Sequence, residues 1–317
     1  MIDSSTPEAY MVNGVLRVED LVVEDETHLV LRARNAADEL LEVEQLRGGA
    51  TPDALVRLYR TVRHPVMPLA LGLSDLDGLG PVVVYAAAPS ISGLALVDGQ
   101  LPSLLAALRV GERLASALAA AHAVGVCHRD LHLGQVRLEA SGLVRLHGWG
   151  AAAMGVRSRR ITFDGAAYLA PEALQRRDVW ASDIYALGVI LLELVVGQRA
   201  TPASVAMVRT PALAAAIRRR DLGLDDAGVD ALVALIRAMV QDDWESRPLA
   251  MEVARRCARV GATLRGTDLV RYAGDHVPAV LAARASASGW AGRRLVPRVV
   301  APAPQQRLGW AVARAGV

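Results

Sequence analysis

Strand-type segments come first in this sequence, and helix-type segments follow them. Short runs of alternating or continuous apolar residues predict strands at residues 15–18, 29–34, 40–46 and 82–85. A helix is expected to begin at Thr51, where Pro52 and Asp53 suit a first turn. Beyond Leu101, apolar residues recur at helical spacing and predict helices at residues 111–124, 182–196, 228–241 and 251–260. This order favours an α+β chain with two lobes.

All basic residues of this chain are arginines. Its 35 positively charged side chains include no lysine, which excludes any chemistry that requires one. The formal net charge is +2, but residues 261–317 carry +6 and the rest of the chain −4. The basic end therefore needs an interpretation separate from that of the acidic body.

The sequence also bears on the compartment in which the protein works. Cys127 and Cys257 are too few for a disulfide framework. The acidic, polar first residues do not resemble a signal peptide. The longest uncharged run, residues 78–97, contains two prolines and favours a strand followed by a loop over a membrane span. We expect a cytoplasmic protein.

One segment carries the strongest motif. Residues 127–138 read CHRDLHLGQVRL, which resembles the catalytic loop of protein kinases, H-R-D-L-x-x-x-N followed by an apolar strand. Further motifs of that family stand in the family's order: RHP at 63–65, HGWG at 147–150, YLAPE at 168–172, SDIY at 182–185 and WESRP at 244–248. Residues 15–260 therefore resemble the bacterial members of the eukaryotic-type (Hanks-type) serine/threonine protein kinase superfamily, with degraded catalytic motifs.

This resemblance implies a bilobal protein-kinase-like fold with a small β-rich N-lobe and a larger helical C-lobe. The implied division is an N-terminal tail (1–12), the N-lobe (13–86), the C-lobe (87–262) and a basic C-terminal extension (263–317). It also implies structural roles for four residues. Asp183 would hold the catalytic-loop backbone, Glu172 would pair with Arg247, and Arg129 would grip a phosphate on the activation segment. Ser158 and Thr162 are the phosphorylation sites expected there; the alternative is a basic, solvated loop.

The residues that serve ATP and Mg²⁺ in the family are altered. Kinases place a lysine on the phosphates and hold two Mg²⁺ ions with an Asp and an Asn. The resemblance aligns Glu44 with the lysine, Gln135 with the Asn and Gly148 with the Asp. Asp130 matches the catalytic base and is expected to be vestigial. Residues 22–28, aligned with the glycine-rich loop, contain three acids and no glycine.

These changes favour a pseudokinase, a catalytically inactive signalling scaffold or regulator, with no cofactor expected. The alternative is an atypical active serine/threonine kinase using ATP and Mg²⁺. In it Gln135 replaces the Asn, and Arg32 or Arg34 replaces the lysine. Against that role, either arginine can be an exposed strand residue paired with Glu42 or Glu44. A small-molecule phosphotransferase fares no better, since that class relies on the same Asp and Asn.

The sequence suggests partners only by class. A pseudokinase is expected to bind another protein, such as an active kinase or a signalling component. The basic tail suits a membrane surface or an acidic partner, or else it wraps around its own acidic body with Trp290 and Trp310 as anchors. Its charge is too dilute for nucleic acid, which is not expected. No metal site is expected among His128, His132 and His147, since no cysteine or carboxylate pattern completes one.

Overall fold

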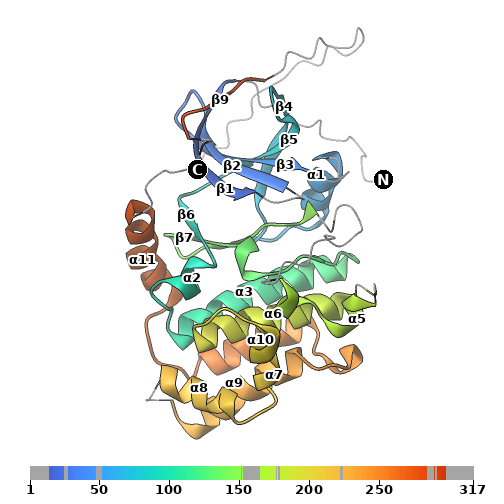
Figure 1. The fold of residues 1–317 in the computed structure, drawn as a ribbon, viewed down its shortest axis with the longest axis vertical. Helices are drawn as coiled ribbons and strands as arrows, with labels where there is room; N and C mark the ends of the chain where they lie inside the picture. Colours follow the sequence, from blue (N-terminus) through green and yellow to red (C-terminus); the bar gives the residue numbers. More distant parts are fainter. Residues whose placement is uncertain are drawn as a thin grey trace, which may run out of the picture.

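The computed structural model describes residues 14–24, 28–47, 52–150, 152, 165–175, 177, 179–221, 224–283, 289 and 291–297. A β-rich lobe lies at the top of Figure 1 and a helical lobe below it. The chain passes from the upper to the lower lobe after residue 86. This arrangement confirms the predicted α+β, bilobal fold.

The upper lobe is a curled six-stranded sheet with one helix beside it. Its strands run in the order β4-β5-β3-β2-β1-β9. The bounds are β1 (Leu16–Glu24), β2 (His28–Arg34), β3 (Leu40–Leu46), β4 (Leu69–Leu76), β5 (Gly80–Ala86) and β9 (Arg294–Leu295), with α1 (Pro52–Thr61) between β3 and β4. The predicted strands 29–34 and 40–46 therefore lie where the sequence places them. Strand β4 was not predicted, and β1 runs six residues past the predicted end at Val18.

The two faces of this sheet differ in polarity. Successive residues of a strand point to opposite faces. On β2 and β3 one face buries Leu31, Leu41 and Val43 in the core of the upper lobe. The other face carries Arg32, Glu42 and Glu44, which are nonetheless buried. Three charged side chains therefore lie inside the protein, where each needs a partner.

The lower lobe packs its helices around α6. Fifteen of the seventeen residues of α6 are buried; α3, α8 and α9 pack against it, and α10 packs against α3 and α9 (Figure 1). A small sheet joins this lobe to the upper one. The elements are β6 (Ser90–Ser92), α2 (Ala95–Asp98), α3 (Leu104–Ala123), β7 (Val136–Glu139), β8 (Val144–Leu146), α5 (Pro171–Leu174), α6 (Trp180–Val196), α7 (Pro202–Met207), α8 (Ala212–Arg220), α9 (Asp226–Met239), α10 (Ala250–Gly261) and α11 (Leu269–Ala283). In the described part of the chain, no helix combines the length and apolarity needed to cross a bilayer.

The C-terminal extension contacts both lobes. Helix α11 packs against α3, β6 and β7. Strand β9 then pairs with the edge strand β1, and Leu295 enters the core of the upper lobe with 4% exposure. Both anchors proposed for a wrapping tail, Trp290 and Trp310, lie outside the described residues.

Candidate functional site between the lobes

The loop that begins with His128 is held by one buried carboxylate. Asp183, in the first turn of α6, accepts the backbone N–H of His128 at 2.8 Å and that of Arg129 at 3.0 Å. Arg129 has a left-handed backbone (φ 68°), a conformation that costs about 1–3 kcal/mol unless its surroundings fix it. His122 Nε2 lies 2.9 Å from Asp183 Oδ2. Although burial opposes ionisation, these contacts hold the pKa of Asp183 below its usual value.

Asp130 and Gln135 lie side by side in this loop. The Gln135 amide Nε2 donates a long hydrogen bond, 3.5 Å, to Asp130 Oδ2. The Gln135 side chain is buried, and its Oε1 has no hydrogen-bond partner among the described residues. The amide therefore presents one unused oxygen next to the carboxylate that matches the family's catalytic base.

Gly148 lies directly against the Gln135 side chain. Its φ is +80°, and a Cβ atom built on it would lie 2.4 Å from Gln135 Cδ. The next residue, Trp149, is fully buried, donates from Nε1 to the Leu146 carbonyl at 2.8 Å and packs on the His128 ring. Mg²⁺ in proteins is held mainly by carboxylates. Gly148, at the position aligned with the Asp that binds Mg²⁺ in kinases, has no side chain. The residues at these positions do not fit a kinase Mg²⁺ site.

The position aligned with the kinase lysine is occupied by a buried acid. Glu44 on β3 is 2% exposed and accepts a 2.5 Å hydrogen bond from the Tyr85 hydroxyl of β5. Burial and the nearby Glu44 charge raise the pKa of Tyr85 well above its usual value, so it stays a donor. Leu55, aligned with the family's helix glutamate, is a fully buried residue of α1. A carboxyl group therefore lies at this point of the cleft, where kinases have a lysine.

A cluster of buried polar side chains links the two lobes. Arg32 on β2 contacts Glu42 Oε1 on β3 at 3.3 Å and Ser90 Oγ on β6 at 3.1 Å. His147, just after β8, brings Nε2 to 3.7 Å from Glu42 Oε2. Despite its burial, Glu42 has a lowered pKa because His147, Arg32 and the nearby Arg137 favour its charged form. We call Arg32, Glu42, His147 and Ser90 the interlobe network.

The two arginines considered as lysine substitutes are both engaged by acids. Arg32 pairs with an acid of the next strand, as one interpretation of the sequence has it, but it is 6% exposed and not a surface residue. The difference arises because this face of β2 and β3 turns toward the lower lobe. Arg34 donates to Glu19 at 2.6 Å and contacts Asp38 at the turn after β2. Its guanidinium is therefore directed to the strand end and not to Asp130.

A small cavity lies beside the interlobe network. Its volume is about 20 Å³, which suits a single water molecule. The chain segment after β5 and the side chains of Arg137, Glu139 and Arg145 complete its lining together with the network residues Glu42, Ser90 and His147. A nucleobase does not fit in this cavity.

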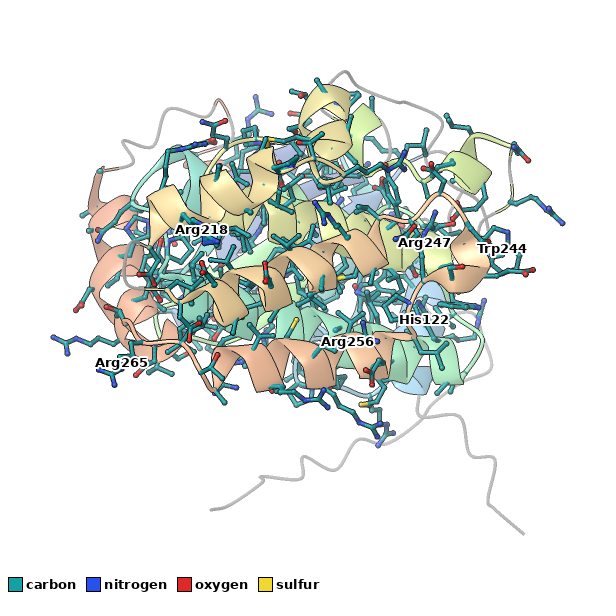
Figure 2. All side chains as sticks on the ribbon, turned by 90° about the horizontal axis from the view of Figure 1, so that it is seen from below. His122, Arg218, Trp244, Arg247, Arg256 and Arg265 are labelled. Carbon is teal, nitrogen blue, oxygen red and sulfur yellow. The ribbon has the colours of Figure 1, made fainter. Side chains whose placement is uncertain are left out.

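The helical lobe keeps a buried ion pair behind the site. Arg247 donates to both carboxylate oxygens of Glu172, at 2.7 and 2.9 Å, and its side chain is fully buried. Ser182 Oγ donates to the same carboxylate at 2.7 Å. The guanidinium also lies 5.0 Å from the Tyr185 ring centroid. Arg247 is labelled in Figure 2, near Trp244. These contacts match the structural roles that the kinase resemblance implies for Glu172 and Arg247.

Part of the predicted site cannot be placed. Ser158 and Thr162, the expected phosphorylation sites, lie outside the described residues, as do residues 25–27 of the stretch aligned with the glycine-rich loop. Arg129 donates from Nη1 to the Ala152 carbonyl at 3.5 Å. Val22 to Glu24, from the same stretch, belong to strand β1.

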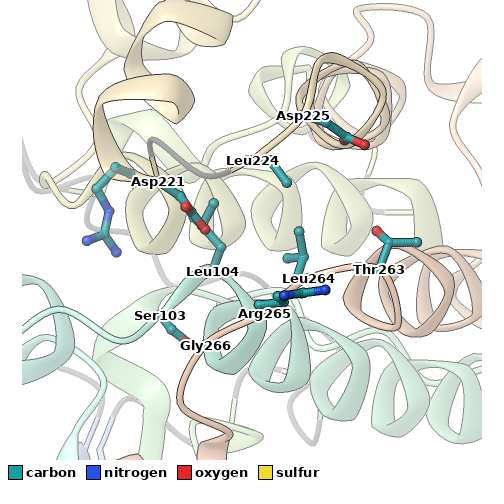
Figure 3. Close-up of a pocket in the computed structure, with 10 residues that line it drawn as sticks. Ser103, Leu104, Asp221, Leu224, Asp225, Thr263, Leu264, Arg265 and Gly266 are labelled. Carbon is teal, nitrogen blue, oxygen red and sulfur yellow. The ribbon is translucent and has the colours of Figure 1, made fainter.

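A larger pocket lies far from this cleft, on the helical lobe. It has a volume of about 680 Å³ and lies between the start of α3, the loop before α9 and the connection from α10 to α11 (Figure 3). Two of its four charged side chains, Arg220 and Asp225, already hold the fold. Asp225 caps α9 by accepting the Gly228 N–H at 2.8 Å, and Arg220 donates to the Pro102 carbonyl at 2.7 Å. The pocket therefore does not offer a catalytic arrangement.

Comparisons with known proteins agree with this geometry. Residues 103–256 match the family described as "Protein kinase domain". The chain is 34% identical over 123 residues to the serine/threonine-protein kinase PknA of Corynebacterium glutamicum, which is 37% of this chain and 26% of that protein. It is 31% identical over 154 residues to the DNA damage-responsive serine/threonine-protein kinase RqkA of Deinococcus radiodurans, 45% of this chain and 23% of that protein.

A third relative extends the matched region. Serine/threonine-protein kinase PknK of Mycobacterium bovis is 33% identical over 176 residues, 51% of this chain and 16% of that protein. The chain thus spans about a quarter or less of the length of these curated relatives. The motif order, the Glu172–Arg247 pair and the matched domain lead to one conclusion: residues 103–256 match the protein kinase domain, and the chain has the two-lobed fold of the protein kinase superfamily.

Proposed function

We propose that this protein is a pseudokinase, a kinase-like module that does not transfer phosphate and acts by binding other proteins. The observation that carries the proposal is the interlobe network. Arg32 and His147 both contact Glu42 between the sheet and the lower lobe. Removing one partner from a buried ion pair costs about 3–5 kcal/mol, so a nucleotide that separated Arg32 from Glu42 would have to offset that cost.

The charge of the cleft supports the same proposal. In active kinases a lysine and two Mg²⁺ ions neutralise the phosphates. Here Glu44 and Glu42 are buried on the cleft side of β3, and Gly148 supplies no metal ligand. A like-charge contact near 4 Å costs about 4 kcal/mol at an effective dielectric constant of about 20. At position 44 ATP would therefore meet a carboxyl group where a kinase provides a cation.

The intact helical lobe supports a binding role. The Glu172–Arg247 pair and the contacts of Asp183 keep the catalytic loop and α6 in a fixed arrangement. Such a lobe offers a stable surface to a protein partner, for example an active kinase or another signalling component, in the cytoplasm. The basic tail would add contact with an acidic partner or a membrane surface.

A second candidate function, an active serine/threonine kinase, has observations of its own. The relatives named above are all called serine/threonine-protein kinases. Asp130 is present, and the buried Oε1 of Gln135 has no hydrogen-bond partner among the described residues. In this alternative, Gln135 Oε1 would serve as a ligand beside Asp130.

Phosphate transfer from labelled ATP distinguishes the two functions. The purified chain is incubated with Mg²⁺ or Mn²⁺ and general protein substrates, alongside Asp130→Ala. A pseudokinase gives no incorporation above the level of Asp130→Ala, either into itself or into the substrates. Incorporation that requires Asp130 would establish the active kinase instead.

A further inference from the structure

Three side chains with metal-binding donor atoms meet where α3 ends and α6 begins. His122 lies in the last turn of α3, Cys127 directly precedes the catalytic loop, and Asp183 lies in the first turn of α6. One ligand atom from each residue lies within 4.8 Å of the other two. Among the described residues this is the one group of three such side chains. His122 is labelled in Figure 2.

We propose that His122, Cys127 and Asp183 form a zinc site. The donor atoms are an imidazole nitrogen, a thiol sulfur and a carboxylate oxygen, all of which Zn²⁺ accepts. A thiolate disfavours Mg²⁺ and Ca²⁺, which prefer oxygen ligands. Zinc–ligand bonds of about 2.0–2.3 Å in tetrahedral geometry place ligand atoms roughly 3.5 Å apart.

The carboxylate of this group is already held in place. Asp183 accepts the backbone N–H of Arg129 on Oδ1 and that of His128 on Oδ2. Hydrogen bonds from groups that do not themselves bind the metal orient a metal ligand. His122 Nε2 contacts the same Oδ2 at 2.9 Å, so the imidazole already points toward the carboxylate. When zinc binds, the imidazole coordinates through Nε2 with its remaining proton on Nδ1, and the Cys127 thiol releases its proton to solvent.

The exposure of the three residues provides an entry path. Asp183 is 2% exposed, whereas His122 is partly exposed and Cys127 is half-buried at the end of an exposed turn. The fourth coordination position therefore faces solvent and suits a water molecule. Bound zinc would join the end of α3, the catalytic loop and α6. This proposal is independent of the pseudokinase function, because its readout requires no nucleotide.

The test uses cobalt as a spectroscopic substitute for zinc. The full-length chain, freed of metal with a chelator, is titrated with Co²⁺ and the thiolate-to-cobalt charge-transfer absorption is recorded; Zn²⁺ is then added. The chain has one other cysteine, Cys257, which is 1% exposed and whose pKa is raised to about 12 by burial. Cys257→Ala is therefore the matched control.

The proposal predicts a band at one equivalent of Co²⁺ that Zn²⁺ removes. Cys257→Ala should keep the band, Cys127→Ser should lose it, and His122→Gln should lose it or weaken Co²⁺ binding at least tenfold. His122→Gln keeps an amide donor for Asp183, so the loop contact survives, and circular dichroism without metal checks that each variant is folded. No band in the wild type, or a band that persists in Cys127→Ser, would overturn the zinc site. If Cys127→Ser does not fold, the Cys257→Ala variant is treated with a thiol reagent with and without Zn²⁺. Protection of Cys127 by Zn²⁺ would support the zinc site, and equal modification in both samples would overturn it.

Discussion

Gln135 and Gly148 are packed so closely that a Cβ atom on residue 148 would lie 2.4 Å from Gln135 Cδ. The two positions aligned with the magnesium ligands of kinases are therefore coupled. The longer amide at 135 occupies the space that a carboxylate at 148 would need. An Asp at position 148 alone would meet the Gln135 side chain, and an Asn at position 135 alone would leave Gly148 without a ligand, so restoring one residue cannot restore the site.

This coupling predicts how substitutions at position 148 change the stability of the protein. Gly148→Ala should destabilise the protein by about 1–3 kcal/mol, from its positive φ and from contact with Gln135. The matched control is Gly78→Ala, because Gly78 has φ +78° and nothing within 4 Å of its Cβ position. Urea unfolding of both, and of Gly148→Ala in a Gln135→Ala background, separates strain from contact. Equal costs for Gly148→Ala and Gly78→Ala would refute the close contact.

The interlobe network makes a second prediction. Glu42→Gln should cost about 3–5 kcal/mol at neutral pH, because it leaves Arg32 buried without its anion. The double variant Arg32→Met/Glu42→Leu should cost much less, because both charges are removed together. Arg209→Ala is the surface control: its pair with Asp242 is more than half exposed on both sides and should contribute about 0–1 kcal/mol. A double variant as unstable as the single one would contradict this account.

The same network gives the stability a defined pH dependence. The pKa of Glu42 is lower in the folded protein than in the unfolded chain, where it is about 4.3. The contribution of Glu42 is therefore fully present above about pH 4.3 and is lost as the pH falls through the folded-state pKa. The stability difference between wild type and Glu42→Gln should shrink on acidification. Urea titrations across that range test it, and a difference that grows toward low pH would have the wrong sign.

The helical lobe depends on the Glu172–Arg247 pair. Arg247→Leu leaves the 5%-exposed Glu172 without its bidentate partner and should destabilise the protein by about 3–5 kcal/mol. Glu172→Gln keeps the shape of the site and should cost less, since the amide oxygen still accepts from Arg247. Thermal unfolding by circular dichroism measures both. If Arg247→Leu left the midpoint unchanged, the pair would not support the lobe.

The C-terminal strand should stabilise the upper lobe. Leu295 is 4% exposed in its core, whereas the next residue, Val296, is 47% exposed. Leu295→Ala should cost about 2–5 kcal/mol and Val296→Ala about 0.5 kcal/mol or less. Urea unfolding of the full chain compares the adjacent substitutions. Equal effects would mean that β9 does not dock on the sheet in solution.

Much of the fold could be predicted from residue patterns. Strands β2 and β3 alternate clearly, and α6 is a long apolar run, so local sequence indicates them. Strand β9 could not be predicted, because two residues show no periodicity and its stability comes from pairing with β1, over 270 residues earlier. Helices α7 and α8 were not predicted, because they have only six and nine residues and so show little helical periodicity.

The motifs that mark the site were visible, but its packing was not. The sequence pointed to Gln135, Gly148 and Glu44 because each departs from a family motif. It did not single out Tyr85, nor did it link His147 to Glu42, because they meet through the pairing of β3 with β5 and the contact between lobes. Acids at alternate positions of a strand otherwise rich in leucine and valine were the available signal that Glu42 and Glu44 share one face.

A thermal-shift titration with ATP, with and without Mg²⁺, tests the central claim most directly. A ligand at about 100 times its dissociation constant stabilises a protein by about 2.7 kcal/mol, which raises the melting temperature by several degrees. The acid at position 44 and the lack of a metal ligand at Gly148 predict no shift under either condition, in the wild type or in Asp130→Ala. A clear Mg²⁺-dependent rise would contradict the pseudokinase account and would show that the cleft opens to accept nucleotide.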